Sequence, residues 1–310
     1  MKTPARTRSI KRLLSVGMLL LAPSVLASEE TRQYGPWLVS AAGGVVNQFQ
    51  ADFSDGPGSV SVQRIFVEAG VGYAWNRQTS VSLSLGAGTA DYDFSSDAAI
   101  DGAQPWGRIN DYRLSLPLRF APTERTSAII IPSLRSYAES GASRSEGRSV
   151  GILGGFSYRF SDSLSLGPGL GWFDDVGDES SAFPIILVDW QISDRWSLNT
   201  GRGLAASQGP GVTLSYKVSD QWTSGITARY EETRFSLKQR PTRVASVGQD
   251  SSAPLLLVLD YSPWPMTNIT AVLGVELAGT LSLEDDAGRE IAESDVDAAV
   301  VAGITFSSRF

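Results

Sequence analysis

The sequence predicts an all-β chain that closes into a single transmembrane antiparallel β-barrel of about 14 strands, within a range of about 12–14. Three observations predict this fold class. Apolar residues alternate with polar or small ones over long stretches, short turns flanked by aromatic residues recur, and these turns alternate with longer connections. Each strand therefore has one apolar face, and successive hairpins share the same orientation.

The first 27 residues are predicted to be a secretory signal peptide. Residues 1–12 contain five basic residues and no acidic one, and the apolar run 13–27 ends in Val-Leu-Ala. This is the pattern of a cleavable signal, and the run is shorter than the roughly 20 residues that a spanning helix needs. We therefore expect a signal peptide over 1–27 and one barrel domain over 28–310, with an anchor helix as the alternative.

The composition excludes several classes of function. The formal charge is −7, and because 1–12 holds five of the positive charges, the rest of the chain carries −12. Such an acidic chain is not expected to bind nucleic acid. The sequence has no Cys and no His, which removes disulfides, the commonest general base and the commonest metal ligand. We expect no enzyme, no catalytic residue, no cofactor and no metal site.

Alternation with a period of two is clearest in 65–75, 150–160, 212–219 and 268–283. A period of two excludes a helix, and several runs exceed the usual strand length of about 5–6 residues. A tilted strand that spans a membrane needs this greater length. The predicted strands lie near 36–50, 61–75, 79–94, 108–121, 126–139, 148–160, 163–174, 182–193, 196–205, 211–219, 222–237, 253–262, 267–283 and 297–310.

Some of these strands contain irregularities. Pro117, Pro132 and Pro168 fall inside predicted strands, where proline removes a ladder hydrogen bond, so we expect a bulge or an early strand end at each. In 79–94 the apolar residues change parity, which predicts a bulge near Gly86–Gly88. In 126–139 apolar and charged residues share one parity, so the two faces of that strand are not assigned.

Three short stretches, "YRFSDSL" (158–164), "WQISDRW" (190–196) and "YKVSDQW" (216–222), repeat one pattern. Ser and Asp bond to nearby backbone in tight turns, and aromatic residues flank each turn. Longer connections lie at 52–59, 95–106, 140–148, 175–181, 205–211, 238–252 and 284–295. We expect short periplasmic turns, extracellular loops at the other end, and an aromatic girdle made of Tyr73, Trp75, Tyr158, Phe160, Trp190, Trp196, Tyr216, Trp222, Tyr261 and Trp264.

The final stretch, "AVVAGITFSSRF" (299–310), ends on Phe310, with Phe306 on the same parity. It resembles the terminal strand of bacterial outer-membrane β-barrel proteins, although Ser308 stands where that family usually has an apolar residue. The resemblance implies location in a Gram-negative outer membrane, contact with its lipid, and recognition of Phe310 and Phe306 by the barrel-assembly machinery. The stretch 209–235 resembles an uncharacterised proteobacterial outer-membrane family, a domain of unknown function that implies no activity.

The function predicted from these features is a passive, porin-like pore for small polar solutes, or a structural barrel whose lumen is blocked by ion pairs. The alternatives are a surface-exposed binding or adhesion protein and a soluble secreted β-sandwich. The acidic stretch 283–290 lacks the spacing of a calcium loop and is expected to be solvated. The residues predicted to line the lumen are Arg64, Glu68, Arg113, Arg119, Arg159, Lys217, Arg229, Glu231, Asp260 and Glu276.

Overall fold

A computed structural model describes residues 36–76, 78–100, 105–177, 180–200, 211–240, 245–285 and 287–310. The predicted signal peptide, residues 1–27, lies outside this part of the chain. Among the described residues, no helix is long and apolar enough to cross a membrane.

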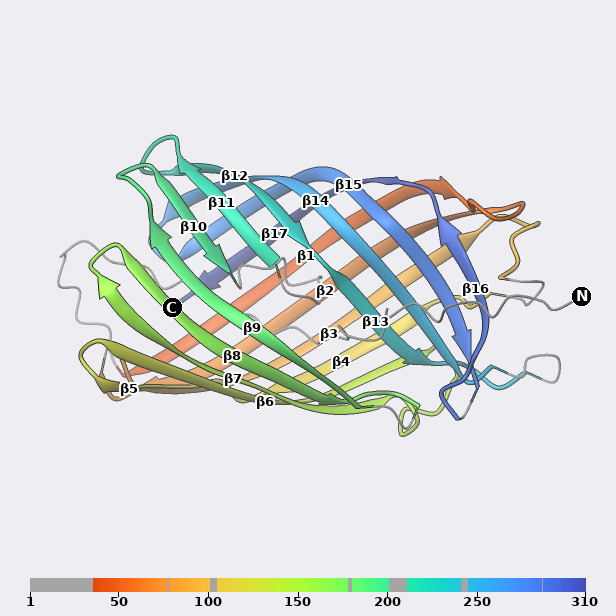
Figure 1. Cartoon of the computed structure of the whole chain (residues 1–310), viewed down its shortest axis with the longest axis horizontal. Coiled ribbons are helices and arrows are strands. Elements are labelled where there is room, and N and C mark those ends of the chain that lie inside the picture. Colours follow the sequence, from red (N-terminus) through yellow and green to blue (C-terminus); the bar gives the residue numbers. More distant parts are fainter. Residues whose placement is uncertain are drawn as a thin grey trace, which may run out of the picture.

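The described chain folds into 17 strand segments that belong to one sheet (Figure 1). They are β1 (Trp37–Asp52), β2 (Ser59–Ala74), β3 (Ser80–Phe94), β4 (Ile109–Ser115), β5 (Leu118–Thr123), β6 (Thr126–Glu139), β7 (Arg148–Ser161), β8 (Leu164–Asp174), β9 (Ser180–Gln191), β10 (Trp196–Thr200), β11 (Gly211–Lys217), β12 (Trp222–Arg229), β13 (Glu231–Ser236), β14 (Val247–Trp264), β15 (Thr267–Glu284), β16 (Glu290–Val296) and β17 (Ala299–Arg309).

These segments form a closed antiparallel barrel of 14 strands, which confirms the predicted fold class. Three strands are each interrupted once, so that β4 and β5, β12 and β13, and β16 and β17 are successive parts of one strand. The barrel closes where β1 pairs with β17 on one side and with β2 on the other. Closure leaves no free sheet edge along this seam, as a bilayer requires.

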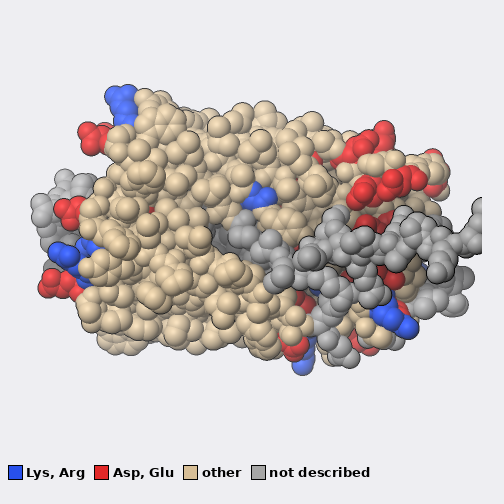
Figure 2. Space-filling view, viewed as in Figure 1, with Lys and Arg blue, Asp and Glu red and all other residues tan. Residues whose placement is uncertain are grey.

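The outer face of the barrel is apolar. On β2, Ile65, Val67 and Val71 are exposed, whereas Arg64 and Phe66 have the opposite parity and are largely covered. In Figure 2 the charged side chains gather at the two ends of the barrel, and the surface between them is almost entirely uncharged on this face. Because a soluble monomer rarely exposes so large an apolar surface, this exterior is that of a membrane-spanning barrel.

Two connections are shorter than predicted. β14 begins at Val247, inside the predicted loop 238–252, and β16 begins at Glu290, inside the predicted loop 284–295. The β14–β15 hairpin is paired as far as Val247 and Glu284. The barrel wall therefore extends beyond the stretch in which apolar and polar side chains alternate. Hydrogen bonding therefore continues where the hydropathy pattern has already faded.

The bulge predicted near Gly86–Gly88 is wrong. β3 pairs with β2 in one continuous register from Ser80 to Phe94. The parity changes because Tyr92 and Phe94 point inward and pack against an apolar cluster inside the barrel. The outward residues at this level are Asp91 and Asp93, which lie beyond the apolar part of the wall.

The predicted irregularity at proline occurs at one of the three positions. Pro117 separates β4 from β5, and the neighbouring Leu116 donates its backbone N–H to the Pro132 carbonyl at 3.0 Å. Pro132 and Pro168 instead lie within β6 and β8, opposite Ile152 and Ile186 respectively, with no register shift at either position.

Near the end with the long connections, β13 touches a strand that is not its neighbour in the wall. Ser236 forms a parallel bridge with Ala138 of β6, although β7 to β11 lie between these strands in the ladder. Leu237, which follows Ser236, and Ala245, which precedes β14, are buried in the same apolar cluster as Tyr137 of β6. The barrel is therefore pinched at this end, and the pinch brings its interior side chains together.

Candidate functional site inside the barrel

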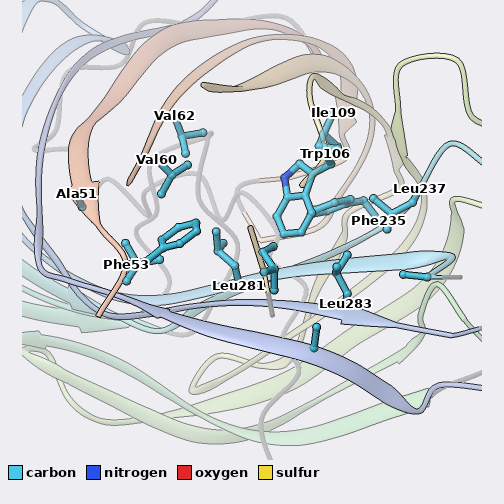
Figure 3. Close-up of a cluster of buried hydrophobic side chains, with 14 of the residues drawn as sticks. Ala51, Phe53, Val60, Val62, Trp106, Ile109, Phe235, Leu237, Leu281 and Leu283 are labelled. Atoms are coloured by element: carbon cyan, nitrogen blue, oxygen red, sulfur yellow. The ribbon is translucent and has the colours of Figure 1, made fainter. Parts of the chain in front are cut away.

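The interior near the long connections is filled by an apolar cluster, which we call the outer cluster. Its centre is aromatic: the ring centroids of Trp106 and Phe235 are 4.9 Å apart, and those of Tyr92 and Trp106 are 5.6 Å apart. Figure 3 shows the side chains pointing inward from the wall, with Trp106 beside Phe235 and Ile109, and Phe53 on the opposite side. The described members are Ala51, Phe53, Val60, Val62, Ile100, Trp106, Ile109, Tyr137, Phe235, Leu237, Ala245, Leu281, Leu283, Ala292, Val296 and Ala299.

Next to the outer cluster lies a buried set of charges, which we call the central network. Arg64 Nη2 lies 3.2 Å from Asp250 Oδ2, and Arg64 Nη1 lies 3.4 Å from Glu276 Oε1. Tyr92 donates its hydroxyl to Asp250 Oδ2 at 2.6 Å. Arg64 also donates to Gln48 Oε1 at 3.5 Å. Since buried charges are costly unless paired, these contacts hold β1, β2, β3, β14 and β15 together across the interior.

The central network extends toward β12 and β13. Arg229 Nε lies 3.4 Å from Glu231 Oε1, and the Arg229 side chain is buried. Glu231 also acts electrostatically on both Arg64 and Glu276. Among the described residues, the network therefore includes the guanidinium groups of Arg64 and Arg229 and the carboxylates of Asp250, Glu276 and Glu231.

A second network lies on β4 and β6. Arg113 Nη2 is 2.8 Å from Asp111 Oδ2, and the Arg135 guanidinium lies 5.4 Å from the centroid of the Phe173 ring. Asp111 also interacts with Tyr137. Arg135 and Asp111 are both buried. A cation over an aromatic face is stabilised by the ring quadrupole, most strongly where water is excluded.

The pinch at the outer end is fixed by Glu139. Its side chain accepts a hydrogen bond from Arg240 Nη2 at 2.7 Å through Oε1 and one from the Lys238 backbone N–H at 2.9 Å through Oε2. Glu139 lies at the end of β6, whereas Lys238 and Arg240 follow β13. The carboxylate thus ties the start of the β13–β14 connection to the opposite side of the barrel.

The interior near the short turns is different. Several of its inward-facing side chains are small and polar and are only partly covered although they point into the barrel: Ser82, Ser84, Ser197, Thr223, Thr270 and Thr305. Partly covered inward side chains mean that other described side chains do not fill this part of the lumen completely. The described side chains therefore fill the turn end less completely than the loop end, although Ile129 and Ile131 pack with Leu153 inside the barrel on the β6 side.

The residues predicted to line the lumen fall into three groups. Arg64, Glu68, Arg113, Arg229, Glu231 and Glu276 lie in or beside the two networks. Asp260, which accepts a hydrogen bond from Thr270 Oγ1 at 2.5 Å, and the partly covered Arg119 lie nearer the turns. Arg159 and Lys217 are exposed at the turn end, and Lys217 Nζ lies 2.7 Å from Asp220 Oδ1 in its own turn.

The sequence prediction missed several charged residues of the interior. Asp250 lies inside the predicted loop 238–252, and Arg135 and Glu139 lie on the strand whose faces were not assigned. Arg135 and Glu139 share their parity with Ile129 and Ile131, and this pattern could have indicated that the four side chains lie on one face of the strand. All four of these β6 residues point inward, since the barrel interior contains both apolar and ionic regions.

The residues of the predicted girdle lie beside the short turns and beside one another. The ring centroids of Trp196 and Tyr216 are 4.9 Å apart, and those of Trp222 and Tyr261 are 4.6 Å apart. Similar contacts join Tyr73 to Trp75 at 5.3 Å and Tyr158 to Phe160 at 5.0 Å. Trp190 and Trp264 are also exposed on the outer side. Trp37, which the prediction omitted, packs on Tyr73 at 5.1 Å.

The C-terminal residue takes part in barrel closure. Phe310 donates its backbone N–H to the Val39 carbonyl at 2.8 Å, and Val39 donates to the Phe310 carbonyl at 3.1 Å. The rings of Phe310 and Phe306 are exposed on the outer face. The last residue thus completes the pairing of the final strand with the first.

The acidic stretch 283–290 forms no metal site among its described residues. Asp285 accepts hydrogen bonds from Arg289 Nε at 2.8 Å and from the Arg289 backbone, and these bonds lower the pKa of the Asp285 carboxyl. The expected solvation of this stretch is wrong for Glu284, which is buried and accepts a hydrogen bond from Arg234 Nη1 at 2.9 Å. The third acidic residue, Asp286, lies outside the described residues.

Comparisons with known proteins show the fold. No protein-family model and no curated protein matches the chain. Among solved structures, the monoaromatic hydrocarbon channel TodX of Pseudomonas putida, as its deltaS2 mutant, matches with a TM-score of 0.52 and 11% identity over 89% of this chain and 91% of that one.

A second match is an outer membrane channel from Pseudomonas putida F1, with a TM-score of 0.51 and 9% identity over 94% of this chain and all of the other. At these identities the likeness shows the fold alone. Together with the closed wall, the apolar exterior and the aromatic residues beside the short turns, it shows that this chain has the fold of bacterial outer-membrane β-barrel channels.

Proposed function

We propose that the chain is an outer-membrane channel for small polar solutes, and that the conformation described here is its closed state. The observation that carries the proposal is the division of the interior. Toward the short turns, small polar side chains that point inward are only partly covered, whereas the half toward the long connections is filled by the outer cluster and the central network. A barrel with a purely structural role does not need a polar, partly unfilled half-lumen. Such a lumen suits the passage of hydrophilic molecules.

The closing element of this proposal is the outer cluster together with the segment held by Glu139. Trp106 and Phe235 lie in contact in the middle of the cluster, and Arg240 and Lys238 are anchored to Glu139 across the barrel. An apolar constriction opposes the passage of water and ions. Opening therefore requires residues 237–240 to leave the interior or the aromatic side chains to separate.

We do not propose a catalytic role. The sequence has neither His nor Cys, and Arg64, Arg113 and Glu139 of the interior are engaged in ion pairs. The two solved proteins compared above are both channels. Contact with outer-membrane lipid and recognition of Phe310 by the assembly machinery are part of the same proposal.

Bilayer conductance tests the proposed channel. Purified full-length chain should give small, infrequent current steps in planar bilayers, and the double variant Trp106→Ala/Phe235→Ala should give steps several-fold larger because the constriction loses two aromatic rings. The matched control is Leu257→Ala, which removes an exposed apolar side chain from the outer wall. Heat-modifiable migration on gels establishes that each variant is folded. Folded protein without conductance in both the wild type and the double variant would favour a structural barrel and overturn the proposal.

A further inference from the structure

Two arginines from different parts of the wall point into the lumen near the short turns. Arg309 is the last inward residue of β17, where it lies opposite Ser40 of β1, and Arg119 belongs to β5. Both side chains are only partly covered. Each has the parity opposite to that of an exposed neighbour, Phe310 or Phe120, and therefore lies on the inner face of its strand.

The two guanidinium groups act on each other electrostatically. Strands β1, β2 and β3 separate β17 from β5 in the wall, which is about 19 Å of sheet at the usual spacing between neighbouring strands. On the convex outer face, side chains this far apart would diverge. Arg309 and Arg119 therefore reach toward each other across the inner face of β1, β2 and β3.

The surface that the two arginines span consists of serines and glycines. Gly70 and Gly72 are inward residues of β2, and they lie opposite Ser40 of β1 and Ser82 of β3 respectively. A Cβ atom at Gly70 would lie 2.6 Å from Ser40 Oγ, and one at Gly72 would lie 2.6 Å from Ser82 Oγ. The hydroxyl groups therefore occupy space that a side chain at either glycine would take. We call these four residues the serine floor.

The serine floor presents hydrogen-bond donors to the lumen. In the described part of the chain, the hydroxyl groups of Ser40 and Ser82 form no hydrogen bond, and both residues are only partly covered. A guanidinium group carries five N–H donors in a planar fork, so it can contact the wall and an anion at the same time. The floor and the two arginines therefore bring neutral and charged donors to one place.

Carboxylates lie outside this place. No described carboxylate forms an ion pair with Arg309. Glu68, the acidic residue of β2, lies beyond Gly70 toward the middle of the barrel, where it interacts with Arg113. Asp189 and Asp260 point inward from β9 and β14, which do not border the floor. The described short turns at the rim carry charges of both signs: Glu124, Arg125, Asp162, Asp194, Arg195 and Asp220.

We propose that Arg309, Arg119 and the serine floor form a binding site for the phosphate group of a small solute. The planar fork of arginine matches the geometry of phosphate oxygens, and hydrogen bonds from charged donors are stronger than those from neutral ones. A bound dianion also offsets the repulsion between the two guanidinium groups. The inference rests on the proposed channel, because it names phosphorylated molecules as the class of small polar solute that the lumen accepts.

Phosphorus NMR tests the site without any measurement of current. The full chain in dodecyl maltoside micelles at pH 8 would be titrated into glucose 6-phosphate and, separately, into inorganic phosphate at equal ionic strength. Both probes are mainly dianionic at this pH. We expect the protein to broaden both signals relative to protein-free micelles. A larger effect on glucose 6-phosphate would show that the sugar also contacts the lumen, whereas equal effects would show recognition of phosphate alone, and either result supports the site.

Variants place the binding at the two arginines and the floor. Arg309→Gln removes one charged donor group and should weaken the apparent affinity for both probes about tenfold. Ser40→Ala removes one neutral donor with little change of shape and should weaken it about fivefold. The matched control is Arg195→Gln, which removes the same charge from the exposed β9–β10 turn and should bind as the wild type does. Heat-modifiable migration on gels establishes that each variant is folded.

Three results would overturn the site. Absence of broadening in the folded wild type would show that no phosphate binds. Equal affinities of the wild type and Arg309→Gln would place the phosphate elsewhere. An equal loss in Arg195→Gln and Arg309→Gln would show that the general charge of the rim attracts the anion. Since no current is measured, failure of the site leaves the bilayer test of the channel intact, and a barrel that binds phosphate without conducting would overturn only the channel.

Discussion

Ser308 and Thr267 face each other across the β15–β17 ladder, and their hydroxyl oxygens lie 2.8 Å apart. Both residues are buried. Ser308 has the outward parity of Phe306 and Phe310 on the final strand, and Thr267 lies opposite it on β15. This bond explains why a polar residue is tolerated at position 308 of the final strand. Each hydroxyl satisfies the other, so neither is left unpaired on an apolar surface.

The pair predicts a measurable coupling. Ser308→Ala alone should lower the free energy of unfolding by about 1 kcal/mol, because the Thr267 hydroxyl loses its partner in a place shielded from water. Thr267→Ala should do the same, and the double variant should cost less than the sum of the two. Denaturant unfolding in lipid vesicles, analysed as a double-mutant cycle, gives the coupling energy. Strictly additive effects would show that the two hydroxyls do not depend on each other.

Phe310→Ala is expected to lower the amount of barrel inserted in the outer membrane and to leave precursor or degraded protein. The exposed Phe310 ring is available to an assembly factor, while its backbone closes the barrel against Val39. The measurement is the level of heat-modifiable protein in the outer-membrane fraction. Phe156→Ala, which removes an exposed ring from the middle of β7, is the control and should insert normally. Unchanged insertion of Phe310→Ala would remove the assembly role of this residue.

Trp196 and Trp222 are expected to lie at the membrane interface, since both are exposed on the outer face beside the short turns. Brominated lipids should quench their fluorescence in reconstituted samples. Replacing either by Phe should therefore reduce the quenchable fraction of the total emission. Trp106→Phe serves as the internal comparison, because Trp106 is buried in the outer cluster and beyond the reach of lipid. If the quenchable fraction fell only in Trp106→Phe, the assignment of the outer face would be wrong.

The loop between β15 and β16 should respond to acid through Asp285. Hydrogen bonds from Arg289 lower the pKa of this carboxyl below its ordinary value of 3.8. A lowered pKa in the folded state means that the loop gains order above the unfolded pKa and loses it as the pH falls through the lowered value. Carboxylate NMR in detergent should show this low pKa, and Arg289→Gln should raise it toward 3.8. An unchanged pKa in Arg289→Gln would contradict the contact.

Much of the wall could be predicted from the sequence because its signals are local. A period of two assigns each side chain of a strand to one face, and Ser-Asp turns set where one strand ends and the next begins. For this reason the predicted strand starts at Trp196 and Trp222 coincide with those of β10 and β12, and the predicted end at 219 lies two residues beyond the end of β11. The approximate strand number and the aromatic residues beside the turns follow from the same signals.

The prediction failed where residues respond to partners that are distant in the chain. Tyr92 and Phe94 looked misplaced on β3 and suggested a bulge, because their inward orientation makes sense only with Trp106 and Phe235 on the other side of the interior. Asp250 was assigned to a loop because its strand had lost the apolar alternation. Inside a filled barrel, polar and apolar side chains share a face, so alternation no longer marks the strand.

Local signals in the chain were therefore enough to specify a long-stranded, closed β-barrel with aromatic short turns at one end, since these features depend on neighbouring residues and on the period of the backbone. What occupies the lumen depends instead on contacts between distant strands. Arg64 meets Asp250 from 186 positions away, and β13 reaches β6 across five intervening strands. Such contacts require barrel closure and the pinch near Glu139, which set the distances between opposite walls and leave no periodic trace in the sequence.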